Sequence, residues 1–585
     1  MIFKEKKYLI FLLLATAVFS LLPVFQLYFT VGQKWQGVLP EYPDDSLYYY
    51  ARMHEVIDGH PFIGNPYFLE HNQEMASSFF VADWLAAMPM VLGFSLNTTV
   101  VFNAVFWSLF FVFLLYLLIN SFELPPKFSV LASFLCYLQA YWLVLRPVAM
   151  QQVFPFFVIF LLALILWFKN PFKKRNAVFL TVASALSFYI YSYLWQITVL
   201  ITFFIFLFLI FQKKIKEIIN LLVIQFSAFI LSLPVIFYTI AQFLRPYYSD
   251  TLDRFGLVYT NMPTASAYYY SRWVFVILML CTLLFLWIKE LRNIIFKTFF
   301  VIFGVSGISL ILNLISNVFL GKEMETANHI GRFVVPWLIP AFVVLLFFSL
   351  QNIRQIGQLQ FFKKIILVLL AFVLVIGIFI NFPPANPFFK IDKEKIISIQ
   401  EYAKPLEWLE KNEPNPMVIW ANDEISKYIP ILTKHYVLFS NSGGFSIVAS
   451  SEVKERYLVS RYFDKLTEQD IEKDIRLYGG AGNAEHQYRT HNREVKVCRI
   501  LQLYRFGYSC RELTDAVSFK GKDYFADLYN KYKNEITPSI DKELKKFNVS
   551  YIVKDNNFDK NFSPEKISGS KLVYQDERFL IYEIK

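Results

Sequence analysis

Two adjacent acids, Asp44 and Asp45, stand between the first long apolar segment and a short stretch with helical character. That stretch, residues 46–57, is rich in Tyr and ends at an Asp-Gly pair. One carboxylate in this position would cap the helix by accepting backbone N–H bonds. Two adjacent carboxylates also suit a general base or a site for a divalent metal such as Mg²⁺ or Mn²⁺. Residue types alone leave both interpretations open, because one cap accounts for only one acid.

A second polar cluster lies in residues 321–332, directly before an apolar segment, and contains two acids, two cations and His329. Such residues at a helix end often only extend towards the membrane surface. The functional interpretation is that Arg332, with His329, holds a phosphate group, since Arg offers a forked and permanently charged set of donors. A charge close to the membrane is costly, which favours a role for it.

The elements that must position these residues are membrane helices. Of the 585 residues, 56% are hydrophobic and 18% charged, and the mean hydropathy is +0.42, whereas soluble domains are about 25% charged. Apolar segments of about 20 residues are long enough to cross a bilayer as helices. We predict eleven spans, at residues 8–30, 98–120, 128–145, 152–168, 177–190, 193–211, 217–243, 273–288, 297–320, 333–350 and 364–381. Polar residues 191–196 divide the long apolar stretch 177–211 into two of these spans.

Loop charges orient the chain. Four short loops, which contain Lys173, Lys213, Lys289 and Lys363, are basic and fall on the same side as the Lys-rich N-terminus, as expected for cytoplasmic loops. We therefore expect an integral inner (plasma) membrane protein with a cytoplasmic N-terminus. The net charge of +11 is concentrated in these loops, so we expect no nucleic-acid partner.

The same alternation places residues 31–97 and the C-terminal part outside the cytoplasm. We expect a membrane domain over residues 1–381, with 31–97 as its first outer loop, and a soluble α/β domain over 382–585. Residues 78–94 are apolar but would invert the later charges if they crossed, so we expect an interfacial or re-entrant helix. Cys498 and Cys510 fall in the outer domain, where they either form a disulfide or remain free.

This layout resembles the GT-C superfamily of membrane glycosyltransferases, which use sugars carried on polyprenyl phosphate or pyrophosphate. The likeness covers the whole chain in layout but is specific only around residues 42–66, where an acidic pair follows the first span and precedes a helix with Tyr and Arg. It implies that Asp44 and Asp45 act as catalytic base or metal ligands. We expect Arg332, His329, Arg52 and Arg146 to bind the substrate and its phosphate.

Within the superfamily, residues 407–423 are most similar to the catalytic subunits of oligosaccharyltransferases, where a Trp-Leu helix leads to a strand and a Trp-Trp-Asp-Tyr-Gly motif. Here Trp420 is followed by Ala421, Asn422 and Asp423, so the second Trp, the Tyr and the Gly are absent. The turn from Arg146 to Gln152 likewise carries Gln where those enzymes carry acids. The implied acceptor is thus an unknown glycan, lipid or protein, and protein N-glycosylation is not the expected reaction.

The sequence favours transfer of a sugar from a polyprenyl-phosphate donor at the outer membrane face, in an enzyme of cell-envelope glycosylation. One alternative is a non-catalytic transporter or assembly factor for lipid-linked glycans. That function predicts ionisable residues near the middle of several spans, whereas here they lie mainly at span ends. A polymerase or ligase of surface polysaccharide is the other alternative.

Overall fold

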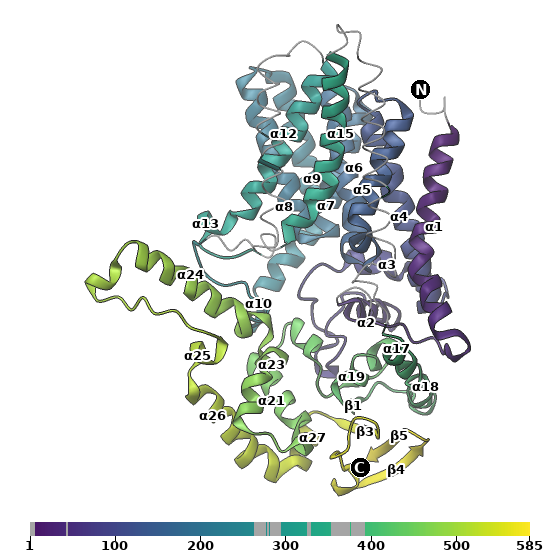
Figure 1. Ribbon diagram of the computed structural model, residues 1–585, viewed down its shortest axis with the longest axis vertical. Coiled ribbons are helices and arrows are strands. Elements are labelled where there is room, and N and C mark those ends of the chain that lie inside the picture. Colours follow the sequence, from purple (N-terminus) through teal and green to yellow (C-terminus); the bar gives the residue numbers. More distant parts are fainter. Residues whose placement is uncertain are drawn as a thin grey trace.

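The computed structural model describes residues 6–41, 45–262, 276–277, 280, 294–324, 329–352, 375 and 392–585. Long helices stand side by side, and a smaller domain formed by the C-terminal residues lies at one end of them (Figure 1). We call the helix ends next to this domain the domain side. The chain is a polytopic α-helical membrane protein with a C-terminal α/β domain, as the sequence predicts.

Nine of the eleven predicted spans fall on described helices. Eight of the described helices are long and apolar enough to cross a bilayer, whereas α7 has 17 residues. The predicted spans 273–288 and 364–381 lie outside the described residues except for residues 276–277, 280 and 375, so the total of eleven stays a prediction. The nine helices are α1 Lys6–Val31, α4 Leu96–Asn120, α5 Pro126–Leu145, α6 Ala149–Lys169, α7 Lys174–Ile190, α8 Ser192–Phe211, α9 Ile215–Phe243, α12 Ile294–Leu314 and α15 Val334–Asn352.

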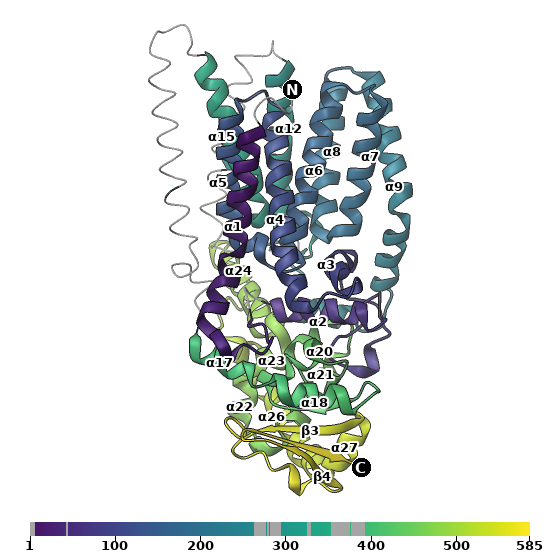
Figure 2. The ribbon, with the colours of Figure 1, turned by 90° about the vertical axis from the view of Figure 1, so that its right-hand side faces the viewer.

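The long apolar stretch 177–211 forms two helices, as predicted. Only Tyr191 separates α7 from α8, and its backbone is extended, with φ −162° and ψ 141°. The chain thereby reverses without a loop, and α7 and α8 lie side by side (Figure 2). This tight reversal holds Tyr191 and Tyr193 on the domain side, where both side chains are buried.

The first loop contains two short helices, α2 Ser46–Ile57 and α3 Val81–Val91. At a rise of about 1.5 Å per residue, α3 is too short for a hydrocarbon layer of about 30 Å. It lies beside α4, where the Asn103 side chain donates a hydrogen bond of 2.8 Å to the carbonyl of Ala86. The observed helix agrees with the expectation of an interfacial or re-entrant element in residues 78–94.

The C-terminal domain is built on a five-stranded sheet in the order β2-β1-β3-β5-β4. Strand β1 is parallel to β2 and β3, and β5 is antiparallel to β3 and β4. The strands are β1 Val418–Trp420, β2 Tyr436–Val437, β3 Val549–Asp555, β4 Ser570–Gln575 and β5 Phe579–Ile584. The helices are α17 Lys393–Gln400, α18 Ala403–Asn412, α19 Asp423–Ser426, α20 Ile429–Leu432, α21 Ser450–Ser460, α22 Glu468–Lys473, α23 Ile475–Ala481, α24 Gln487–Ile500, α25 Ala516–Lys520, α26 Lys522–Lys531 and α27 Ile540–Lys546.

The first loop and the C-terminal domain share one hydrophobic core, which includes residues of α2, α3 and the sheet. Backbone bonds join them too, because the Val437 N–H on β2 donates to the carbonyl of Tyr67 at 2.8 Å. The Gln400 side chain bonds three backbone groups of residues 36–38. The loop that carries the acidic pair is therefore held by the domain. The predicted boundary at residue 381 lies outside the described part of the chain.

Helix α10, Tyr248–Phe255, fastens the end of α9 to the domain. Arg254 is buried, and its guanidinium donates to the carbonyl groups of Gly444 and Val448 at 2.7 and 2.8 Å and to the Ser450 hydroxyl at 2.8 Å. Five donors in a rigid fork suit such a set of backbone acceptors. The segment 245–254 is thus a structural link between α9 and the domain. Helix α13, Ser316–Leu320, follows α12 on the same side.

Candidate functional site

Asp45 directly precedes α2 but does not cap it. Its backbone has φ 41°, and its side chain makes no capping bond to the helix. Instead, its carboxylate forms a two-point ion pair with Arg146, with Nε–Oδ1 at 2.9 Å and Nη2–Oδ2 at 2.5 Å. The geometry is not that of a helix cap, and the role of Asp45 as a base or metal ligand stays a prediction. Its neighbour Asp44 lies outside the described residues.

Arg146 lies at the end of α5, in the turn that leads to α6, and its side chain is buried. Further along the chain, in the first turns of α6, Gln152 is fully buried, and its side-chain amide has no hydrogen-bond partner among the described residues. Sequence reasoning noted that this turn lacks an acid. In the structure, Arg146 in this turn pairs with Asp45 in the first loop, although 101 residues separate the two.

Arg52, on the same helix that Asp45 precedes, is held by Asp83 on α3. The bonds are Nε–Oδ1 at 2.9 Å and Nη2–Oδ2 at 2.7 Å, and Nη2 also donates to the carbonyl of Phe79 at 2.5 Å. Both side chains are almost completely buried, at 1% and 0% exposure. These contacts give Arg52 the role of fixing α2 against α3. A contact of Arg52 with the substrate phosphate stays a prediction, and the bonds to Asp83 and Phe79 argue against it.

His329 and Arg332 directly precede α15, at its domain-side end. Burial, together with the charges of Arg332 and Arg146, holds the pKa of His329 well below its usual range, so its ring is neutral. Both cations therefore act on one imidazole, although they come from segments far apart in the chain. The Nε of Arg332 is buried and has no hydrogen-bond partner within the described residues. A guanidinium with an unused donor beside a neutral imidazole suits an anion.

A row of aromatic rings runs from the Asp45–Arg146 ion pair to His329, and sequence reasoning missed its role. The ring of Tyr49 lies 5.5 Å from the Arg146 guanidinium, and Tyr191 also acts electrostatically on the Tyr49 phenol. From there the ring centroids of Tyr191 and Tyr193 are 4.5 Å apart, and those of Tyr193 and His329 are 5.0 Å apart. The break in the apolar stretch 177–211 was the signal that could have identified Tyr191 and Tyr193.

A cavity of about 270 Å³ adjoins this aromatic row on the domain side. Phe79 forms part of its wall, and the Phe79 ring lies 3.8 Å from that of Tyr191. Phe188 lines both this cavity and an apolar groove of about 380 Å³ between α8 and α9. The cavity has a mixed lining of aromatic and polar side chains, and the neighbouring groove is apolar, which suits a ligand with a polar head and a long apolar chain. The polar side chains of the cavity include Ser77, Ser78, Ser192, Gln196, Thr239, Gln242, Lys322 and Glu323.

Trp420, which carried the partial likeness to oligosaccharyltransferases, belongs to the core of the C-terminal domain. Its side chain is 1% exposed, its ring stacks on Phe463 at 5.3 Å, and its indole N–H donates to the carbonyl of Ser460 at 3.2 Å. Asn422 caps α19 with its side chain. These contacts explain the residues as structural and leave no acceptor-reading role for Trp420.

The fit of a divalent cation at the acidic pair can be judged only for Asp45. Both of its carboxylate oxygens accept from Arg146, so a cation would compete with a guanidinium. In the part of the chain that the structure describes, no group of three or more His, Cys, Asp or Glu residues could hold a metal. The described donors do not fit Mg²⁺ or Mn²⁺, and a metal bound at Asp44 and Asp45 stays a prediction.

No protein-family model and no curated protein matches the chain. Similar solved structures include ArnT from Cupriavidus metallidurans bound to undecaprenyl phosphate, with 11% identity and a TM-score of 0.44 over 97% of both chains. The oligosaccharyltransferase of Archaeoglobus fulgidus, tethered to an acceptor peptide, has 12% identity and a TM-score of 0.41 over 99% of this chain and 74% of that one. The structure of the same oligosaccharyltransferase in complex with Zn and sulfate has 12% identity and a TM-score of 0.44 over 82% of this chain and 69% of that one. Likeness at this level assigns no residue role or substrate to this chain.

Proposed function

We propose that this protein transfers a sugar or oligosaccharide from a polyprenyl-phosphate donor to an acceptor at the outer face of the membrane. The observation that carries the proposal is the meeting of Asp45, Arg146, His329 and Arg332, which come from three separate segments, at the domain-side ends of the spans. One carboxylate beside two cations offers both charges that such a transfer needs.

The cations serve the phosphate. Arg332 and Arg146 would bind the phosphate oxygens that link the sugar to the lipid, because guanidinium groups form paired, charge-assisted bonds with phosphate. A phosphate would also balance the charges of Arg332 and Arg146, which add to the effect of burial in lowering the pKa of His329. As the bond to the sugar breaks, negative charge grows on the leaving phosphate, and donors already in place stabilise that change most.

The carboxylate serves the acceptor. In the proposed step, Asp45 takes the proton of an acceptor hydroxyl while that oxygen forms a bond to the anomeric carbon. The bond from this carbon to the phosphate oxygen breaks, and its electron pair leaves with the lipid phosphate. The ion pair with Arg146 keeps Asp45 charged, and binding of the donor would draw Arg146 towards the phosphate and release the carboxylate.

The surroundings of the site accommodate both substrates. The cavity beside Phe79 would receive the sugar, and the groove between α8 and α9 would receive the apolar chain of the donor. The C-terminal domain faces the other side of the acidic loop, because α2 packs against α20. We therefore assign the acceptor to that side, as an unknown glycan, lipid or protein.

Binding of decaprenyl phosphate to the purified protein in nanodiscs tests the donor assignment. Arg332→Gln should weaken binding about 10- to 100-fold, since a bond to a charged group contributes about 1.5–3 kcal/mol. Arg245→Gln is the matched control, because Arg245 is exposed at the end of α9 on the same side. Equal affinity of wild type and Arg332→Gln would remove the phosphate role of Arg332. A wild type that does not bind the lipid phosphate would refute the donor class.

A further inference from the structure

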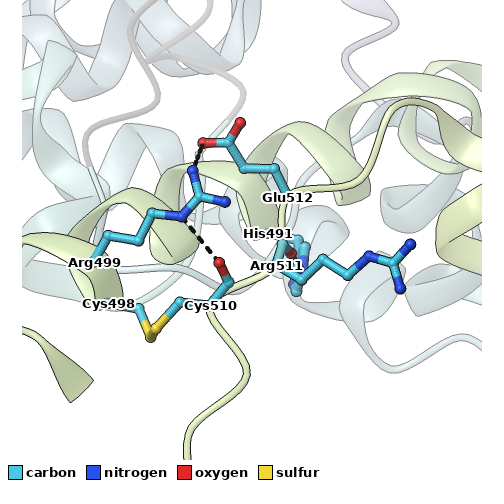
Figure 3. The surroundings of a disulfide bond; sticks show 6 residues. All are labelled: His491, Cys498, Arg499, Cys510, Arg511 and Glu512. Carbon is cyan, nitrogen blue, oxygen red and sulfur yellow. Dashed lines mark hydrogen bonds and ion pairs between the residues drawn. A yellow bond between two sulfur atoms is a disulfide. The ribbon is translucent and has the colours of Figure 1, made fainter. Parts of the chain in front are cut away.

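Residues 487–511 form an arm that projects sideways from the C-terminal domain. It consists of α24 and a short turn, and the following chain returns along the helix (Figure 1). The Cys498–Cys510 disulfide, which the sequence left undecided, closes the tip (Figure 3). Arg499 adds bonds of 3.0 Å to the carbonyl of Cys510 and 3.2 Å to Glu512. The tip is therefore a braced element.

The tip presents large apolar side chains to solvent. Ile500 is 76% exposed and Phe506 is 79% exposed. Leu501, Tyr504 and Tyr508 lie between or beside them and are each more than half exposed. Apolar side chains gathered on one tip mark a docking site, because a soluble surface rarely collects them.

The arm is also strongly basic. Residues 487–511 contain six Lys and Arg residues and one Glu, which gives a net charge of +5. Lys496 and Arg505 are exposed next to the apolar tip. Apolar and aromatic residues framed by basic ones are typical of segments that lie in the headgroup layer of an anionic bilayer.

The base of the arm is fixed where the spans end. His486 donates from Nδ1 to the carbonyl of Gly256 at 3.1 Å, and Thr260 donates to Glu494 on α24 at 3.4 Å. Residues 256–260 directly follow α10, which links the end of α9 to the domain. Both views place α24 next to the domain-side ends of the helices, and Figure 1 shows it below α13. Phe319 and Leu320 of α13 are themselves 72% and 63% exposed.

We propose that this arm is a membrane-surface anchor, whose tip at residues 500–508 enters the headgroup layer of an anionic bilayer. Tyr504 and Tyr508 would take the interfacial positions that aromatic residues prefer, and Lys496 and Arg505 would contact lipid phosphates. The anchor gives the C-terminal domain a second attachment to the membrane beside α10. A protein partner is the competing occupant, and it requires the tip to be exposed to water when no such partner is present.

Full-length protein in nanodiscs, without any other protein, tests this directly. A spin label at Phe506→Cys, with the native disulfide verified by mass spectrometry, reports access of oxygen and of a water-soluble nickel complex. Leu572→Cys is the matched control, because Leu572 is an exposed apolar residue on β4 at the far end of the domain. We expect several-fold less nickel access at 506 than at 572 in bilayers that contain phosphatidylglycerol. Equal access at both sites would overturn the anchor and favour a protein partner.

Two further measurements keep the test decisive. A label at Leu501→Cys should reproduce the protection at 506, which guards against a local effect of one substitution. Lys496→Gln with Arg505→Gln should lessen protection in phosphatidylglycerol bilayers but not in phosphatidylcholine alone. Protection that does not depend on lipid charge or on these two residues would overturn the assignment of an anionic surface.

Discussion

Arg52 and Asp83 provide a test that separates positioning of the acidic loop from contact with the donor. Their side chains are at most 1% exposed and are joined by two bonds of 2.7 and 2.9 Å. Removing one member of a buried ion pair leaves an uncompensated charge and costs about 3–5 kcal/mol. We therefore expect Arg52→Met and Asp83→Asn each to lower the melting temperature in detergent by several degrees.

The double variant Arg52→Met with Asp83→Leu should recover most of this loss, because replacing a buried pair by apolar side chains is often neutral or stabilising. If Arg52 only positions α2, the double variant also binds decaprenyl phosphate like the wild type. Melting followed by size-exclusion chromatography, together with lipid binding, measures both properties. A double variant that recovers its melting temperature but loses the lipid would refute the positioning role and place Arg52 in the phosphate site.

Three further predictions concern the domain contacts and the basic cluster. Burial disfavours the charged form of Glu452, but the contacts with His71 and Arg456 outweigh burial and lower the pKa of Glu452 from 4.5 to about 2. Burial likewise disfavours the charged form of His71, but the contacts with Glu452 and Glu74 outweigh it and raise the pKa of His71 above 6.5. Glu452 therefore stabilises the fold fully above pH 4.5, and this stabilisation is lost as the pH falls towards 2. His71 stabilises the fold fully below pH 6.5, and this stabilisation is lost as the pH rises through its raised pKa. Glu452→Gln should therefore lower the melting temperature most between about pH 4.5 and 6.5, and a constant difference down to pH 2 would contradict the ion pair. Arg254→Lys should destabilise the protein by about 2 kcal/mol through loss of the fork, and unchanged protease resistance of the domain link would argue against this. Decaprenyl phosphate should raise the pKa of His329, seen by NMR as a histidine signal absent from His329→Gln, and an unmoved titration would place the anion elsewhere.

The sequence predicted the elements well because each depends on local properties. Apolar length located the described spans, and the polar break at Tyr191 divided α7 from α8. The sequence did not predict which charged residues pair with one another. Arg146 lies 101 residues from Asp45, and Asp83 lies 31 residues from Arg52, so both partners are set by tertiary packing. The role of Tyr193 was missed for the same reason, because it depends on the position of His329.

The central claim is that Asp45 accepts a proton during sugar transfer. The assay combines the reconstituted protein, radiolabelled polyprenyl-phosphate monosaccharides and an envelope extract of the source cells, and it counts label that leaves the lipid fraction. We expect Asp45→Asn to lose nearly all transfer while it still binds decaprenyl phosphate, and Asp58→Asn, an acid that pairs with His54 at the other end of α2, to transfer normally. Full transfer by a folded Asp45→Asn variant would contradict the account.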